Sequence, residues 1–182
     1  MIIVEGPDNS GKSTLVSQLS KDFDLLIAER PHGPPKSVED LIDRALKLLL
    51  KQDKKRYIID RHPLFGEDIY GPILRGHNKW LEKTDIHYSL MSLLKFSQET
   101  KSTFIIYCRP PDEVVLNLKT HQVKDYDTAE HLKSLEEKAS EVLEAYDSKM
   151  DYWANFKYNY KDPDSYKLLI NTLRKEYFNE CE

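Results

Sequence analysis

The chain has 182 residues, of which 40% are hydrophobic and 32% are charged, and this composition excludes collagen-like and wholly disordered proteins. It carries 27 Lys and Arg residues against 31 Asp and Glu residues, so its net charge of −4 gives no basic excess for binding nucleic acid. No apolar run approaches the roughly 18 residues of a membrane-spanning helix, so we expect no membrane partner. Two cysteines do not suffice for a disulfide framework, and the first residues lack a basic leader, which favours a cytoplasmic location.

Short apolar segments alternate with amphipathic ones along the chain. The first half is expected to form a strand at 2–5, a helix at 12–22, a strand at 25–28, a helix that begins near Ser37 and a strand at 57–60. The second half is expected to form a helix at 85–98, a strand at 103–108, a long helix from 128 to about 150, a weak strand at 155–160 and a last helix from Pro163. This order predicts one α/β domain over residues 1–182, with a five-stranded parallel sheet covered by helices on both faces.

A phosphate-binding pattern stands between the first strand and the first helix. Residues 6–14 match G-x-x-x-x-G-K-[ST], in which glycines let the backbone N–H groups turn toward phosphate oxygens. The following helix adds its positive N-terminus, Lys12 adds a charge on the outer phosphates, and Ser13 offers a hydroxyl to Mg²⁺. The pattern predicts a P-loop NTPase fold that binds ATP and Mg²⁺ through Gly6, Asn9, Ser10, Gly11, Lys12, Ser13 and Thr14.

Three further motifs bear on the kind of P-loop protein. An acid, Asp8, stands inside the loop, Asp60-Arg61-His62 closes the third strand, and residues 69–76 read Ile-Tyr-Gly-Pro-Ile-Leu-Arg-Gly. In these motifs, and in the order of its elements over essentially the whole chain, the protein resembles the thymidylate kinase group of nucleoside monophosphate kinases. It resembles the deoxynucleoside kinases more loosely.

The resemblance implies roles for individual residues. Asp8 would take the 3′-hydroxyl of the acceptor sugar, and Asp60 would support Mg²⁺ together with Ser13. Arg61 would grip the acceptor phosphate and the transferring group, since its planar fork binds phosphate oxygens in pairs. Further contacts to the substrate are expected from Tyr70, Arg75 and Phe65.

The segment at 69–76 departs from the family pattern. Tyr70, Arg75 and Gly76 match, whereas the family's Gln and two of its glycines are missing, and Phe65-Gly66 stand where hydroxyl residues are common. These changes fall where recognition of the acceptor is expected. The identity of the accepted base therefore stays open.

The run Glu29-Arg30-Pro31 after the second strand bears on two different reactions. Thymidylate kinases place an Arg near here on the acceptor phosphate, and Arg30 is our candidate for that role. Deoxynucleoside kinases place a catalytic Glu followed by Pro here, as base on a free 5′-hydroxyl. Glu29 is the candidate for that alternative, although Arg30 separates it from the proline.

The resemblance also implies a small lid at about residues 112–128. Family members bring arginines over the transferring phosphate from this region, but here no Arg occurs between Asp112 and Ile170. The candidates are Lys119 and Lys124, or Arg61 and Arg109 in their place. A lysine neutralises charge without the same two-pronged contact.

We therefore expect a kinase that transfers the γ-phosphoryl group of ATP to a deoxynucleoside monophosphate, thymidylate-like, giving the diphosphate. The alternatives are a deoxynucleoside kinase with Glu29 as base and, less favoured, a nucleotide-dependent ATPase or switch. The expected partner is a small nucleotide, with no nucleic acid and no membrane. The resemblance leaves a homodimer as an option.

Overall fold

The computed structural model describes residues 1–29, 35–51, 56–75, 85–109, 111 and 138–179. Five strands form one sheet in the order β2-β3-β1-β4-β5, and all four neighbouring pairs run parallel. The predicted five-stranded parallel α/β sheet is thus confirmed. The strands are β1 (Ile2–Glu5), β2 (Leu26–Ile27), β3 (Tyr57–Asp60), β4 (Phe104–Cys108) and β5 (Phe156–Tyr158).

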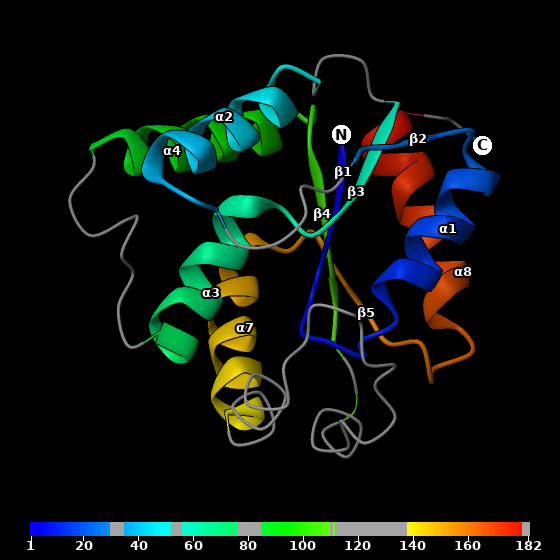
Figure 1. Cartoon of the computed structure of the whole chain (residues 1–182). Helices are drawn as coiled ribbons and strands as arrows, with labels where there is room; N and C mark the ends of the chain where they lie inside the picture. Colours follow the sequence, from blue (N-terminus) through cyan, green and yellow to red (C-terminus); the bar gives the residue numbers. More distant parts are fainter. Residues whose placement is uncertain (30–34, 52–55, 76–84, 110, 112–137, 180–182) are drawn as a thin grey trace.

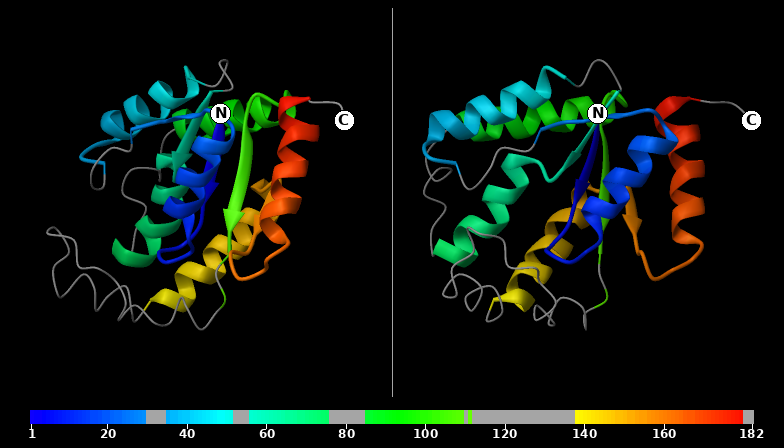
Figure 2. Two further views of the ribbon diagram at one scale, coloured as in Figure 1. Left: turned by 90° about the vertical axis from the view of Figure 1, so that its right-hand side faces the viewer. Right: turned by 45° about the vertical axis from the view of Figure 1, so that its right-hand side comes forward.

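Helices cover both faces of the sheet (Figures 1 and 2). On one side lie α1 (Lys12–Asp22), α8 (Ser165–Thr172) and the π-helical η3 (Leu173–Phe178) that continues α8. The other side carries α2 (Val38–Leu49), α3 (Pro63–Arg75), α4 (Asp85–Glu99) and α7 (Ala139–Trp153). No helix in the described part of the chain is long and apolar enough to cross a membrane.

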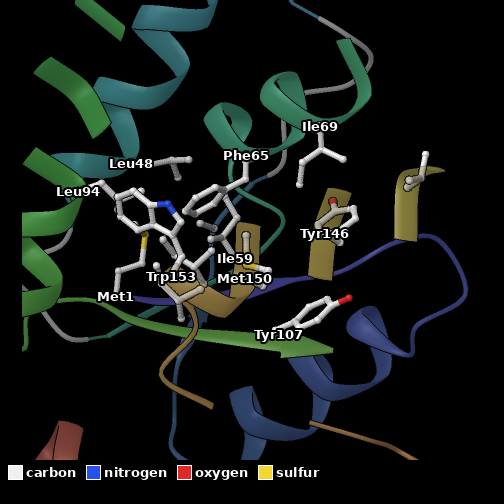
Figure 3. Packing of buried hydrophobic residues seen from close by; sticks show 14 residues of the cluster. Met1, Leu48, Ile59, Phe65, Ile69, Leu94, Tyr107, Tyr146, Met150 and Trp153 are labelled. Carbon is white, nitrogen blue, oxygen red and sulfur yellow. The ribbon is translucent and has the colours of Figure 1, made fainter. Parts of the chain in front are cut away.

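The alternation of side chains along each strand builds two separate cores. Ile2 and Val4 of β1 pack with α1 and α8, whereas Met1 and Ile3 pack with the helices on the opposite face. Figure 3 shows the second of these cores, with Met1 and Trp153 at one end and Tyr107 and Tyr146 at the other. The tyrosine end points toward the carboxyl edge of the sheet, where the predicted phosphate-binding loop follows β1.

The structure differs from the sequence expectations at several boundaries. Helix α3 was not expected, because Gly66, Gly71 and Pro72 stand within it and disfavour a helix. The second strand pairs only over Leu26–Ile27, at the edge of the sheet. The last helix begins at Ser165, two residues after the predicted start at Pro163.

Other boundaries agree closely with the sequence. The hydroxyl of Ser37 accepts a hydrogen bond from the Asp40 amide and caps α2, as its position predicted. The described part of the long charged helix runs from Ala139 to Trp153, three residues beyond the expected end. Its predicted first part, 128–137, lies outside the described residues.

Candidate active site

The loop at residues 6–11 wraps tightly between β1 and α1. Gly6 (φ 149°) and Gly11 (φ 80°) adopt backbone angles that side chains disfavour. A Cβ atom at Gly6 would lie 2.4 Å from the carbonyl oxygen of Cys108, and one at Gly11 would press on the Tyr160 ring. The first turn of α1 holds no acidic residue and its cap makes no side-chain hydrogen bond, so its N–H groups are left for an anion.

The ammonium group of Lys12 is turned into this loop. Its Nζ donates a hydrogen bond to the carbonyl oxygen of Pro7 at 2.5 Å and lies 3.3 Å from the hydroxyl oxygen of Ser10. Burial, and secondarily the positive charge of Arg61, lower the pKa of Lys12 from its ordinary value of 10.5 to about 8. A bound phosphate would reverse this shift by supplying the missing negative charge.

The start of α1 meets the end of β3 through two oxygen-bearing side chains. The hydroxyl of Ser13 donates a hydrogen bond to Oδ2 of Asp60 at 2.6 Å. The second carboxylate oxygen, Oδ1, is buried and has no hydrogen-bond partner in the described part of the structure. Hydroxyl and carboxylate oxygens are ligands that Mg²⁺ prefers, so this pair fits the ion.

These two side chains do not form a closed metal cage. In the residues that the structure describes, no group of three or more His, Cys, Asp or Glu side chains could hold a metal ion. Mg²⁺ typically keeps several waters and is shared between one or two protein oxygens and substrate phosphates. Ser13 and Asp60 therefore fit the protein's share of an Mg²⁺ ion that a nucleotide would carry.

Arg61 reaches from the end of β3 across the loop. Its Nη2 donates hydrogen bonds to the carbonyl oxygen of Gly6 (3.1 Å), Oδ1 of Asp8 (3.1 Å) and the hydroxyl of Tyr70 (3.2 Å). The guanidinium also lies over the Tyr70 ring, 4.9 Å from its centre. Its side chain is only 10% exposed.

An acid and a phenol complete the surroundings of Arg61. The Tyr70 hydroxyl lies 3.5 Å from Oδ2 of Asp8, and burial raises the pKa of Tyr70 well above its ordinary value. The structure thus brings Asp8, Asp60, Arg61 and Tyr70 together beside the loop, although they come from three separate segments of the chain.

Unpaired polar atoms mark the same place. Among the described residues, five buried side-chain nitrogen or oxygen atoms lack a hydrogen-bond partner, and four of them belong to the loop or to the residues that end β3. Buried polar groups are nearly always paired in folded proteins, so such a concentration is typical of a site completed by a ligand. The four atoms are Asn9 Nδ2, Asp60 Oδ1, Arg61 Nε and His62 Nε2.

Arg109 lies at the end of β4 in a different setting. Its Nε and Nη2 donate hydrogen bonds to both oxygens of Asp147 on α7, at 2.9 to 3.1 Å. The Tyr107 hydroxyl donates to the same carboxylate at 2.8 Å. An arginine that the sequence suggested for catalysis is therefore already engaged by a carboxylate.

Phe65 does not join the site. Its ring is fully buried in the core and packs edge-on against Trp153, with 5.3 Å between the ring centres (Figure 3). It therefore offers no surface to a nucleotide, and its place on the first turns of α3, facing the sheet, is the reason. The expected substrate contact through Phe65 has no support in this arrangement.

Several predicted residues lie outside what the structure describes. Glu29 is exposed after β2, at the end of a described segment. The backbone of Arg75 ends α3, but its side chain is not described. Arg30, Lys119, Lys124 and the expected lid at about 112–128 lie outside the described residues altogether.

The sequence reasoning missed a buried acid at the end of β1. Glu5 is fully buried, with one carboxylate oxygen accepting the His62 backbone N–H and the other 3.5 Å from the Tyr146 hydroxyl. Burial raises the pKa of Glu5 from 4.5 to about 7. The one signal in the sequence was an acid closing an otherwise apolar strand. Its partner Tyr146, and likewise Asp147, come from a helix far along the chain and gave no such signal.

Comparison with known proteins supports the fold. No protein-family model and no curated protein matches the chain. Among solved structures, the YorR protein of Bacillus subtilis in complex with phosphorylated GDP is similar at 20% identity and TM-score 0.66, over 100% of this chain and 99% of that one. Deoxyadenosine kinase from M. mycoides with bound dATP is similar at 21% identity and TM-score 0.54, over 95% and 98% of the two chains.

The same enzyme in a second state gives a similar result. With the products dCMP and dCDP bound, it matches at 16% identity and TM-score 0.51, over 96% of this chain and 98% of that one. The protein thus shares the fold of the YorR protein and of deoxyadenosine kinase over nearly its full length. The narrower resemblance to thymidylate kinases stays a prediction.

Proposed function

We propose that the protein is a kinase that transfers the γ-phosphoryl group of ATP to a deoxynucleoside monophosphate, thymidylate-like, forming the diphosphate. One observation carries the proposal. Nη2 of Arg61, from the end of β3, lies 3.1 Å from the carbonyl oxygen of Gly6, so the arginine proposed to bind phosphate stands directly beside the predicted phosphate-binding loop. A site that holds a donor phosphate and an acceptor phosphate in line needs a positive group beside the donor loop, which supports the proposal.

The geometry supports the following roles on the donor side. The N–H groups at the start of α1 and the ammonium of Lys12 would bind the outer phosphates of ATP. Ser13 and Asp60 would hold Mg²⁺, which supplies neutralisation of the phosphate charge. Lys12 leaves Pro7 and Ser10 for the phosphate, because a charged partner outweighs two neutral ones.

On the acceptor side, Arg61 would bind the acceptor phosphate and the transferring group through the donors it now gives to Gly6 and Asp8. Asp8 and Tyr70 would face the sugar of the acceptor. The bond from the γ-phosphorus to the leaving oxygen of ADP breaks while an oxygen of the acceptor phosphate forms the new one. Such an oxygen is already anionic near pH 7, so the reaction needs no strong base.

A deoxynucleoside kinase is the second candidate, favoured by the similarity to a deoxyadenosine kinase whose structure holds dCMP and dCDP. In that reaction a free 5′-hydroxyl is the nucleophile and Glu29 would take its proton. Glu29 stands exposed next to the carboxyl edge of the sheet. The roles suggested for Arg30, Arg75, Lys119, Lys124 and Arg109, and an assembly of two copies, rest on the family resemblance.

The deciding experiment measures ADP release from ATP and Mg²⁺ with each deoxynucleoside monophosphate and each free deoxynucleoside. We expect activity with monophosphates alone, lost in Lys12→Ala. Activity with free deoxynucleosides, lost in Glu29→Gln, would establish the second candidate instead. No stimulation by either acceptor would contradict both and leave nucleotide hydrolysis as the reaction.

A further inference from the structure

The peptide that carries Arg61 is held in an unusual conformation. Arg61 has φ 72°, in the left-handed region that residues with a side chain seldom occupy. Such a conformation persists only where the surroundings hold it. What holds Arg61 therefore decides where its guanidinium points.

Two consecutive residues at the end of β1 hold this turn. The Arg61 backbone N–H donates to the carbonyl oxygen of Val4 at 2.9 Å, which merely continues the pairing of β1 with β3. The next N–H, that of His62, donates to the side-chain carboxylate of Glu5. The ladder of the sheet has ended at this point, so a side chain supplies the acceptor that backbone no longer can.

The surroundings of Glu5 fix its carboxylate in place. The side chain is fully buried, and its second oxygen faces the Tyr146 hydroxyl at 3.5 Å. Tyr146 in turn packs edge-on against Tyr70, with ring centres 6.0 Å apart, and Tyr70 carries the guanidinium of Arg61 on its ring. Glu5 therefore supports Arg61 from two sides, through the backbone and through a pair of tyrosines.

His62 does not compete for this carboxylate with a charge of its own. Burial lowers the pKa of His62 to about 3, so the imidazole is neutral, and its Nδ1 accepts the Leu64 N–H at 3.3 Å. The positive groups that act on Glu5 are Arg61 and Lys12, which belong to the site. A carboxylate buried under a phosphate site, where it repels phosphate, calls for a reason beyond packing.

We propose that Glu5 is a positioning residue, whose carboxylate holds the Arg61–His62 turn in the left-handed conformation that aims the Arg61 guanidinium at the phosphate-binding loop. The role of Arg61 in transfer rests on the proposed function, but its conformation does not. Glu5 has no exposed surface. In this proposal its effect on the reaction passes through the position of Arg61.

Glu5→Leu fills the same buried space without an acceptor, while Glu5→Gln keeps an acceptor oxygen for the His62 N–H. Displacing a phosphate clamp by about 1 Å typically costs on the order of 100-fold in rate. We expect a loss of kcat near that size in Glu5→Leu, with the KM for ATP within about twofold of wild type, and rescue to within roughly fivefold in Glu5→Gln. Equal losses in both variants would overturn the proposal.

A double-variant cycle separates positioning from mere structural support. With Arg61→Ala as background, Glu5→Leu has nothing left to position, so it should lower kcat less than about threefold. Leu48→Ala, a cavity in the same core away from the turn, serves as the control for lost stability and should leave kcat unchanged. An undiminished effect of Glu5→Leu in the Arg61→Ala background contradicts the proposal.

A crystal structure of Glu5→Leu gives a readout that does not need activity. We expect Arg61 to leave the left-handed region and its guanidinium to move off the Gly6 carbonyl. An unchanged Arg61 would overturn the inference, even if the protein proves to be no kinase. Should Glu5→Leu fail to fold, Glu5→Asp, whose carboxylate is one methylene short of the His62 N–H, takes its place with the same expected outcome. Conversely, normal transfer in Arg61→Ala would contradict the proposed function and leave this structural test standing.

Discussion

Arg61 and Arg109 follow β3 and β4, the two strands that flank β1 in the sheet, yet the two guanidinium groups have different partners. Arg61 is 10% exposed and rests on a carbonyl, a phenol and one oxygen of Asp8, with its Nε buried and unpaired in the described structure. Arg109 is 38% exposed and its fork is matched by both oxygens of Asp147. The more buried arginine thus has the less complete set of partners.

We interpret this difference as one between a candidate binding residue, Arg61, and a structural one, Arg109. Desolvating a guanidinium costs free energy unless hydrogen bonds and an opposite charge offset it. Asp147 supplies that offset to Arg109 within the protein itself. The surroundings of Arg61 leave part of it to be supplied by a phosphate, so Arg61 is the stronger candidate for the transfer site.

The largest expected effect compares the two arginines directly. Arg61→Ala should lower kcat/KM for phosphoryl transfer by about 100- to 1000-fold, or roughly 3–4 kcal/mol of transition-state stabilisation. Arg109→Ala should lower it less than about tenfold. Steady-state kinetics under identical conditions makes the test, with Arg61→Lys expected to lie between Ala and wild type. Equal losses in the two alanine variants would refute the distinction.

A second test concerns Glu5, the buried acid near Arg61. Because burial raises the pKa of Glu5 from 4.5 to about 7, the folded protein binds a proton there that the unfolded chain releases. The stabilisation from Glu5 is complete below about pH 4.5 and is lost as the pH rises through about 7. Urea unfolding between pH 4.5 and 8 should show the free energy of unfolding of wild type falling relative to Glu5→Gln. If the free energy of unfolding changed with pH in the same way in wild type and Glu5→Gln, the raised pKa of Glu5 would be contradicted.

A third test concerns the protonation of Lys12, whose pKa burial and the nearby charge of Arg61 both lower. Its pKa of about 8 in the protein without nucleotide means that Lys12 loses its proton above pH 8, whereas bound phosphate keeps it protonated. Nucleotide affinity should therefore fall up to tenfold per pH unit above about 8, with proton uptake on binding. Calorimetry with ADP measures both quantities. The variant Lys12→Met should bind ADP more weakly at every pH. Its affinity should not fall further above pH 8, and its binding should take up no proton.

The smallest expected effect belongs to the pair at the end of β4. Asp147→Asn removes a charge from a pair that water still reaches, so the free energy of unfolding should fall by about 1 kcal/mol or less. Asp151→Asn, one turn further along α7 and paired with Lys157 in the open, is the matched control and should change it even less. A loss of several kcal/mol in Asp147→Asn would show the Arg109 pair to be more deeply engaged than its exposure indicates.

Much of the fold could be predicted because its signals are local. The strand at 57–60, the helix at 12–22 and the Ser37 cap each depend on a few adjacent residues, and the structure has all three. Helix α3 was missed because two glycines and Pro72 disfavour a helix more strongly than its apolar positions favour one, when only adjacent residues are considered. Its packing against α2 and α7, which only the folded chain provides, overrides that preference.

The residues of the candidate site also differ in how far their signals are local. The loop residues and the Asp60–Arg61 pair are short motifs, so sequence alone could place them beside each other at the carboxyl edge of the sheet. Glu5 depends on Tyr146, 141 positions away, and on a backbone N–H that any residue at position 62 would offer. Phe65 shows the reverse error, since an aromatic near a motif invites a ligand contact while its ring in fact belongs to the core.

The hydrogen bond from Arg61 to the Gly6 carbonyl joins the end of β3 to the first residue of the phosphate-binding loop. A ligand that draws the guanidinium away removes a restraint from the loop, and a nucleotide that reshapes the loop alters what the guanidinium can reach. Thermodynamic reciprocity requires these two effects to be equal in free energy. Under the proposed function, the saturation curve for one substrate should therefore shift with the concentration of the other, and this single side chain would be a source of cooperativity between the two halves of the site.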